Sequence, residues 1–391
     1  MKRVPRTVWV LGGVSLLMDL SSELVHSLLP IFMTTVLGAS MLAVGIVEGI
    51  AEATASVLKA FSGALSDRLR RRKPLLILGY GLAALSKPLF PFAGSVALVM
   101  GARFMDRIGK GIRGAPRDAL IADITPEALR GRAYGLRQAL DTIGAVLGPL
   151  AAIGLMLAFA SDVRTVLWFA VIPAALSVAV LVLFVREPEK APPPPVTSSL
   201  SFESLKKFNF HYWAIVSLGA VLTLARFSEA FLILRAQELG MALALLPVVM
   251  VVMNLVYTAI AYPAGVAADR GHHRALLVWG LLALIASDLL LARGSLPLLF
   301  AGVVLWGVHM GLTQSLLSTL VAGAAPENLR GTAFGVFHLV SGIALLAASV
   351  LAGWLWGEFG AAWAFYAGAA FTVVALAGML LVTAKESPER P

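Results

Sequence analysis

Acidic side chains recur at helical spacing inside long apolar segments of the chain. Asp19, Glu23 and His26 are separated by four and then three residues, so they share one face of a helix. Glu48 and Glu52 are also four residues apart. A carboxylate enclosed by apolar walls can bind and release a proton, and it can exchange that proton for a neighbouring cation. We predict that the proton-coupling residues are Asp19, Glu23, Glu48, Glu52 and Asp141.

Basic side chains form a second pattern, which is densest between residues 103 and 117. Asp106, Lys110, Arg113 and Arg117 recur at positions that place them along one side of a helix. Arginine can hold an anionic group through two hydrogen bonds, so this stripe could bind an anionic or zwitterionic ligand. Alternatively, some of the arginines only neutralise the acids. The predicted substrate-binding residues are His26, Arg103, Arg107, Lys110, Arg113, Arg117, Arg137, Arg226, Glu229, Tyr257, Trp306 and Gln314.

The elements that must position these residues are membrane-spanning helices. Some 59% of the residues are hydrophobic, only 14% are charged, and the mean hydropathy is +0.87. A bilayer span requires roughly 20 mostly apolar residues, and segments of this kind recur along the whole chain. Within such spans a charged stripe indicates a water-filled interior rather than a solvated surface helix. The predicted spans are 8–37, 41–65, 74–93, 95–122, 131–157, 163–185, 210–238, 242–267, 274–292, 295–322, 331–355 and 361–383.

Two internal repeats indicate that the chain is duplicated. The hexapeptide PEALRG at 126–131 returns as PENLRG at 326–331, and GALSDR at 63–68 returns as GVAADR at 265–270. Nearly equal offsets at two separate places predict two homologous halves with a binding site between them. We therefore predict an all-α membrane protein with an N-terminal bundle at 1–185, a Pro-rich cytoplasmic linker at 186–209 and a C-terminal bundle at 210–391.

The distribution of charge predicts the topology. When both termini face the cytoplasm, only two of the 31 Lys and Arg residues, Arg164 and Arg293, fall in external loops. The net charge of +9 is then explained by topology and anionic lipids, and nucleic acid is not an expected partner. Lys87, near the outer end of its span, is expected to extend toward the membrane surface. Asp19 and Glu23 interrupt the first apolar run, so we expect a retained helix rather than a signal peptide.

No cofactor or metal is expected from the sequence. The chain contains no cysteine, and Glu23 and His26 give only weak support for a metal site. Without a targeting segment, the chain is expected in a bacterial inner membrane, as a monomer whose partners are lipids, protons and a small-molecule substrate. The charged spans could also belong to a membrane enzyme or scaffold, but the duplicated halves and the lack of an extramembrane catalytic module disfavour this alternative.

The loop at 63–74 resembles a motif of the major facilitator superfamily of secondary transporters, and the resemblance extends over essentially the whole chain. The sequence GALSDRLRRRKP is similar to the loop between the second and third helices, although Arg70 replaces the usual glycine. The resemblance implies that a latch stabilises one conformation, with the gating residues Gly63, Asp67 and Arg68 and their second-half counterparts Asp269 and Arg270. It also implies that an arginine of the fourth helix takes part in proton coupling, either Arg103 or Arg107.

The fifth predicted helix resembles the antiporter branches of this superfamily. Gly135, Gly144, Gly148 and Pro149 match the spacing of the antiporter motif, whereas Ala152 and Ile153 replace its two final glycines. Small residues at these positions allow close helix packing, which suits a gating helix. The resemblance implies a proton-coupled exporter that works by alternating access, with Gly144, Gly148 and Pro149 in gating roles. The alternative within transport is a proton symporter or facilitator that takes up a nutrient, an organic anion or a siderophore.

Overall fold

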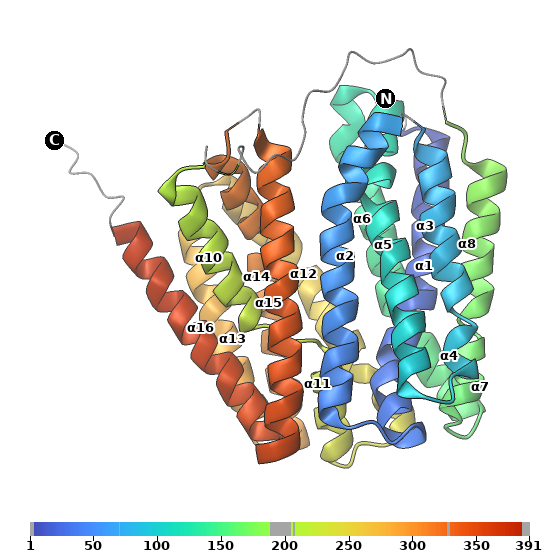
Figure 1. The fold of residues 1–391 in the computed structure, drawn as a ribbon, viewed down its shortest axis with the longest axis vertical. Helices are drawn as coiled ribbons and strands as arrows, with labels where there is room; N and C mark the ends of the chain where they lie inside the picture. The colour runs from blue at the N-terminus through green and yellow to red at the C-terminus, as the bar shows by residue number, and fades with distance from the viewer. Residues whose placement is uncertain (1–3, 70, 188–204, 206–207, 327–328, 385–391) are drawn as a thin grey trace. The chain divides into compact units, whose positions relative to one another are not determined.

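In the computed structural model, helices form almost the whole of the described chain, which comprises residues 4–69, 71–187, 205, 208–326 and 329–384 (Figure 1). Its contacts divide into two compact units. Unit 1 comprises Met1–Ala39, Ile50–Ser198 and Met241–Val251, and unit 2 comprises Ser40–Gly49, Ser199–Gly240 and Val252–Pro391. Helices α2 and α12 contribute residues to both units.

The helices of the first half follow the predicted spans closely. α1 continues after Pro30 as a π-helical turn, η1, because proline cannot donate the next backbone hydrogen bond. The third span consists of α3 and α4, and the sixth consists of α7 and α8. The elements are α1 (Arg6–Ile31), η1 (Phe32–Val36), α2 (Met41–Leu69), α3 (Arg72–Ser86), α4 (Leu89–Phe92), α5 (Val96–Ile124), η2 (Glu127–Leu129), α6 (Arg130–Ala158), α7 (Val163–Trp168) and α8 (Val171–Phe184).

The second half repeats this order, with one break that the sequence did not predict. The seventh span is interrupted at residues 225–229, between α10 and α11. The elements are α10 (Phe210–Leu224), α11 (Ala230–Glu238), η3 (Leu243–Leu245), α12 (Val248–Asp269), α13 (His273–Leu291), α14 (Leu296–Ala324), α15 (Arg330–Phe359) and α16 (Ala361–Ala384). Every predicted span therefore corresponds to one helix or to two consecutive helices.

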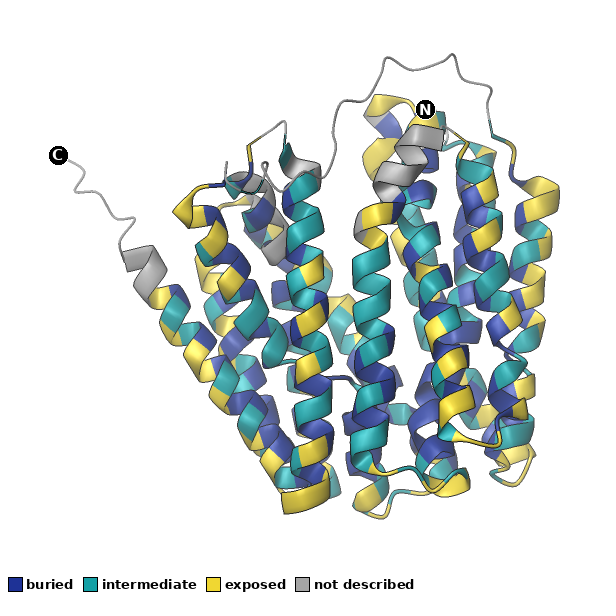
Figure 2. Ribbon diagram, in the orientation of Figure 1, coloured by how far each residue is buried: buried dark blue, intermediate teal, exposed yellow. Residues whose placement is uncertain are grey.

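Ten segments of the described chain are long and apolar enough to cross a bilayer. Two predicted spans do not meet that criterion. α5 contains the charged stripe, and the break leaves α10 with only 15 residues. Exposed and buried faces alternate along the helices (Figure 2), and the exposed faces include large apolar side chains such as Leu183, Tyr262 and Trp279. Such faces suit contact with lipid, where there is no water to make apolar exposure costly.

The same glycine contacts recur in both units. In unit 1, Gly111 of α5 packs against Leu58 of α2, and in unit 2, Gly311 of α14 packs against Ile260 of α12. These partners are separated by 200 and 202 residues, the offsets of the two sequence repeats. Glycine at both positions allows the two helix backbones to approach closely. The duplication seen in the loop sequences therefore extends to the packing inside each unit.

Candidate functional site

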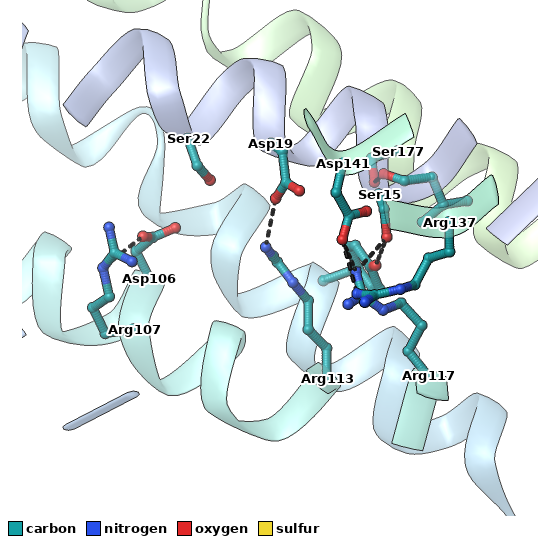
Figure 3. A network of polar contacts seen from close by, with 12 residues as sticks. Ser15, Asp19, Ser22, Asp106, Arg107, Arg113, Arg117, Arg137, Asp141 and Ser177 are labelled. Atoms are coloured by element: carbon teal, nitrogen blue, oxygen red, sulfur yellow. Dashed lines mark hydrogen bonds and ion pairs between the residues drawn. The ribbon is translucent and has the colours of Figure 1, made fainter. Parts of the chain in front are cut away.

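A network of charged side chains lies among α1, α2, α3, α5 and α6 of unit 1 (Figure 3). α5 contributes most of it, because the predicted stripe faces the interior of the unit. Arg103, Asp106, Arg107 and Arg113 are each at most 5% exposed. Burial of this many charges is tolerated only where they pair with one another, so the individual contacts define the site.

Asp106 is at the centre of the most fully buried group of ion pairs. Its carboxylate accepts a hydrogen bond from Lys87 Nζ at 2.7 Å, and Arg107 Nε lies 3.6 Å away. Lys87 Nζ also donates to Ser22 Oγ at 3.0 Å. The expectation that Lys87 extends toward the membrane surface is therefore wrong. Its ammonium is fully buried because α3 packs along α5 and brings it to an acid 19 residues away.

Glu52 and Asp19 connect α5 to two other helices. Arg107 Nη1 lies 3.2 Å from Glu52 of α2, and Arg113 Nη2 lies 3.4 Å from Asp19 of α1. The Arg113 guanidinium also lies 4.7 Å from the centre of the Tyr80 ring, a distance that suits a cation–π contact. Two predicted acids and two predicted arginines thus form ion pairs between helices.

A second group of ion pairs lies farther along α5 and reaches α6. Arg137 Nη1 donates to Asp141 Oδ2 at 2.9 Å, as their spacing of four residues predicted. Arg117 Nη1 lies 3.4 Å from the same oxygen and donates to Ser15 Oγ at 2.6 Å. Asp141 therefore holds two guanidinium groups that come from different helices.

Glu23 pairs within its own helix. Its Oε2 lies 3.4 Å from His26 Nδ1, a contact that is ionic when the imidazole is protonated. Lys110 lies between Arg107 and Arg113 on the stripe, and its side chain is exposed. It makes no hydrogen bond or ion pair with any described residue. The site therefore combines paired carboxylates with a cation that is available to bind an anion.

Two glycines of α6 pack against the helix that holds these acids. A β-carbon at Gly144 would lie 2.6 Å from the Leu16 carbonyl oxygen and 3.2 Å from Asp19 Cβ. A β-carbon at Gly148 would lie 2.8 Å from Glu23 Cβ. The predicted gating glycines thus set the distance between α6 and the acidic face of α1. Pro149 follows inside α6 and is buried.

The remaining predicted site residues belong to unit 2. Glu48, although four residues from Glu52, accepts a hydrogen bond from Ser228 Oγ at 3.4 Å in the break of the seventh span. Arg226 and Glu229 are half-buried in or beside the same break, and Tyr257 is half-buried on α12. Trp306 is fully buried, and Gln314 is exposed.

The predicted latch is only partly described by the structure. The side chains of Gly63, Asp67, Arg68 and Asp269 lie outside the described residues, although the backbone there is helical. Arg270 is exposed in the turn after α12. The latch therefore remains a prediction.

Two buried ionisable groups are not found by the sequence reasoning. Lys87 is expected at the membrane surface, and Asp288 of α13 is not among the predicted site residues, yet both are fully buried. The available signal was the high cost of any charge inside an apolar span. That signal applies to Asp288, because no other ionisable residue occurs in the sequence between Arg274 and Arg293.

Comparison with known proteins identifies the family of this chain. The family model described as Major Facilitator Superfamily matches residues 11–234 and 215–391. The chain is 31% identical over 367 residues to an uncharacterized MFS-type transporter of Methanocaldococcus jannaschii, covering 91% of this chain and 89% of the relative. It is 26% identical over 415 residues to the inner membrane transport protein YajR of Escherichia coli, covering 98% and 84%.

The fold is also similar to that of solved structures. A crystal structure of a POT family transporter in complex with a thioalcohol-conjugated peptide matches with a TM-score of 0.78 over 97% of this chain and 96% of that chain, at 14% sequence identity. At that identity the likeness concerns the fold alone. It agrees with the predicted architecture of twelve helices in two bundles.

Proposed function

Because the chain belongs to the Major Facilitator Superfamily of membrane transporters, we propose that it is a proton-coupled secondary active transporter that exports a polar or charged small molecule. The observation that supports this proposal is the set of interhelical ion pairs in unit 1. Asp19 and Glu52 each face an arginine of α5, while Lys110 between those arginines has no partner among the described residues.

The ion pairs supply a physical basis for coupling. A carboxylate can be neutralised either by a proton or by a neighbouring cation. When Asp19 binds a proton, its attraction to Arg113, 3.4 Å away, is lost and the guanidinium is free to hold a substrate anion. When the substrate leaves, the guanidinium can pair with the carboxylate again. Because these pairs join α1 or α2 to α5, a change in protonation also changes the forces between helices.

The substrate class follows from the free cation. Lys110 is exposed and lies on α5 between Arg107 and Arg113, so an anionic or zwitterionic group bound at Lys110 has two further cations nearby once the acids that pair with them are protonated. A lipophilic drug without charge would leave Lys110 unpaired. We therefore favour a charged metabolite, a chelate or an amphiphilic drug that carries an anionic group.

Export is favoured over uptake because of the α6 glycines. Gly144 and Gly148 match the antiporter spacing, and both pack against the turns of α1 that hold Asp19 and Glu23. The second candidate remains a proton symporter or facilitator for uptake. We further propose a monomer in the inner membrane with both termini cytoplasmic, as the bias of Lys and Arg between the loops indicates.

The test begins with a thermal-shift screen of purified protein against organic anions, metal chelates and amphiphilic drugs at two pH values. The compound that stabilises most strongly is then used in proteoliposomes under an imposed pH gradient. We expect the compound to move against the proton flow in the wild type. Movement in the same direction as the protons would establish the symport alternative.

Glu23→Gln tests the coupling itself. The variant keeps the size of the side chain but removes the proton-binding carboxylate, so it should still bind the compound while losing pH-driven accumulation. Glu127→Gln is a matched control, because the Glu127 side chain is 91% exposed at the start of η2 and, among the described residues, it pairs with the exposed Arg130 alone, at 3.8 Å. Flux in Glu23→Gln with the pH dependence of the wild type would remove Glu23 from the mechanism.

A further inference from the structure

Asp288 of α13 is a fully buried ionisable group without a polar partner among the described residues. Its side chain is fully buried, and neither carboxylate oxygen has a hydrogen-bond partner in the part of the chain that the structure describes. No described cation forms an ion pair with it. A buried carboxylate without a partner costs several kcal/mol or more, whereas a protonated carboxyl group avoids most of that cost.

The atoms around Asp288 suit the neutral form. A β-carbon at Gly368 of α16 would lie 2.8 Å from Asp288 Oδ2, 3.2 Å from Phe227 Cε1 and 3.3 Å from the Ala225 carbonyl oxygen. The carboxyl group therefore lies close to an aromatic ring and to the end of α10, where the helix breaks. A neutral carboxyl group can donate a hydrogen bond to a carbonyl oxygen, while a carboxylate can only accept.

The charged groups on the neighbouring helices are all engaged elsewhere or have no contact with Asp288. On α14, His309 Nδ1 contacts the Gly280 carbonyl oxygen, about two turns away along α13. On α11, Arg235 donates to the carbonyl oxygens of Leu291, Ala292 and Arg293 and pairs with Glu238 at 2.8 Å. The other ionisable groups on the packed elements are His211, Tyr212, Arg226, Glu229, His273, Arg274 and Tyr366.

The duplication shows what is unusual about this position. An offset of 201 residues aligns Asp288 with Lys87, and an offset of 200 aligns Trp306 with Asp106. In unit 1 the aligned pair is an ion pair with a nitrogen–oxygen distance of 2.7 Å. In unit 2 an acid stands at the position of the lysine and an indole at the position of the aspartate, and Trp306 Nε1 is also buried without a hydrogen-bond partner among the described residues. The position of Asp288 thus carries an ionisable group in both halves, but the aligned partner position is ionisable only in unit 1.

A small apolar cavity lies beside the break. Phe227 and Gly368 are among the residues that line its volume of about 10 Å³, and Asp288 is not. The break itself, at residues 225–229, lies between the two helices. The helical hydrogen-bond pattern is interrupted after the bond from the Ala225 amide to the Val221 carbonyl oxygen, so this segment can move more easily than the flanking helices. Movement of this segment would change the contacts of the carboxyl group.

We infer that Asp288 is a proton-binding site of unit 2, separate from the ion-pair network of unit 1. It holds a proton in the conformation described here and exchanges it when the segment between α10 and α11 moves away from α16. The role of this proton in transport rests on the proposed function, but the presence of the proton does not.

Infrared difference spectroscopy of the purified protein in lipid nanodiscs tests the inference without a substrate. We compare the wild type, Asp288→Asn and the control Asp162→Asn at neutral pH, in H₂O and in D₂O. Asn is a neutral mimic of the protonated acid, so Asp288→Asn should fold with an unchanged melting temperature. It should lack one carbonyl band of a protonated carboxylic acid, and in the wild type that band should shift in D₂O.

Asp162 is a suitable control because it is exposed in a loop and accepts hydrogen bonds from Thr165, which lower the pKa of its carboxyl group. Asp162→Asn should therefore lose a carboxylate band and no carboxylic acid band. Loss of a carboxylate band in Asp288→Asn would show that the group is ionised and would overturn the inference. A carboxylic acid band that stays unshifted in D₂O would also overturn it, because the proton would then be permanently enclosed.

Should Asp288→Asn fail to fold, Asp288→Glu supplies the same test, because the carboxylic acid band should then move in frequency and remain. None of these results depends on the direction or substrate of transport. Failure of the proposed function and failure of this inference are therefore distinguishable.

Discussion

Gly148→Ala should destabilise unit 1 and disturb the acidic face of α1. The added β-carbon would lie 2.8 Å from the Leu20 carbonyl oxygen, 2.9 Å from the Leu24 amide nitrogen and 2.8 Å from Glu23 Cβ. Two of these atoms belong to the α1 backbone, so they cannot rotate away as the end of a flexible side chain could. The helix must move as a body, and overpacking of this kind typically costs about 1–3 kcal/mol.

The loss of stability in Gly148→Ala is best measured against the effect of the same substitution at a second glycine of α6. A β-carbon at Gly154 would meet no atom within 4 Å, so Gly154→Ala changes only the helix propensity, which favours Ala by about 1 kcal/mol. Comparing the two variants removes the propensity term, which is common to both. The remaining difference of about 1–3 kcal/mol corresponds to roughly 2–4 °C in melting temperature per kcal/mol for a domain of this size.

The assay is thermal unfolding of both variants in the same detergent, followed by pH-driven flux in proteoliposomes. We expect Gly154→Ala to melt at or above the wild type and Gly148→Ala to melt below it. Gly144→Ala should resemble Gly148→Ala, because its β-carbon would lie 2.6 Å from the Leu16 carbonyl oxygen. Equal melting temperatures for Gly148→Ala and Gly154→Ala would refute the conclusion that this contact sets the spacing of α1 and α6.

Two further predictions concern unit 1. Asp106→Asn should lower the free energy of unfolding by about 3–5 kcal/mol, because it leaves Lys87, Arg103 and Arg107 facing one another without their shared acid. Lys87→Met should lower it by less, since both arginines still face Asp106. Chemical denaturation of the two variants checks this order, and equal losses of stability would contradict it. Asp162→Ala should cost about 1 kcal/mol, since Asp162 accepts hydrogen bonds from the Arg164 and Thr165 amides at the start of α7. Because these bonds hold the pKa of Asp162 below its ordinary value of 3.8, the stabilisation is present above that pH and is lost as the pH falls below it. The melting temperatures of wild type and Asp162→Ala should therefore converge in acid, and a constant difference would exclude the carboxylate as the cap.

The spans and the charged stripe could be predicted from the sequence because both are local patterns. Apolar runs of sufficient length give the helices, and the interval between Arg137 and Asp141 gives their ion pair directly. The partners of α5 could not be predicted in this way. Whether Arg107 meets Glu52 or another acid depends on which turns of α2 and α5 face each other, and one sequence contains no signal for that register.

Because a single sequence does not show which helix turns face each other, some of the predictions were wrong. Lys87 lies near the end of an apolar run, which is typical of a side chain that reaches the membrane surface, and only the packing of α3 against α5 shows its contact with Asp106. The spacing of Glu48 and Glu52 places them on one face of a helix. They nevertheless belong to different units, because the part of α2 up to Gly49 is assigned to unit 2 and the part from Ile50 to unit 1. The break at 225–229 contains neither glycine nor proline, so the usual signals for a helix interruption are absent.

The two units share a framework of close helix contacts and differ in the polar groups placed on it. Gly79 of α3 lies against Gly109 and Arg113 of α5, and the corresponding Gly280 of α13 lies against His309 and Thr313 of α14. The backbone contact is therefore common to both units, while a guanidinium in one is replaced by a hydroxyl in the other. Close packing requires only that a small residue be retained at the point of contact, so the neighbouring position was free to gain or lose charge. The same framework therefore accommodates a set of ion pairs in unit 1 and a lone buried acid, Asp288, in unit 2 without a change of fold.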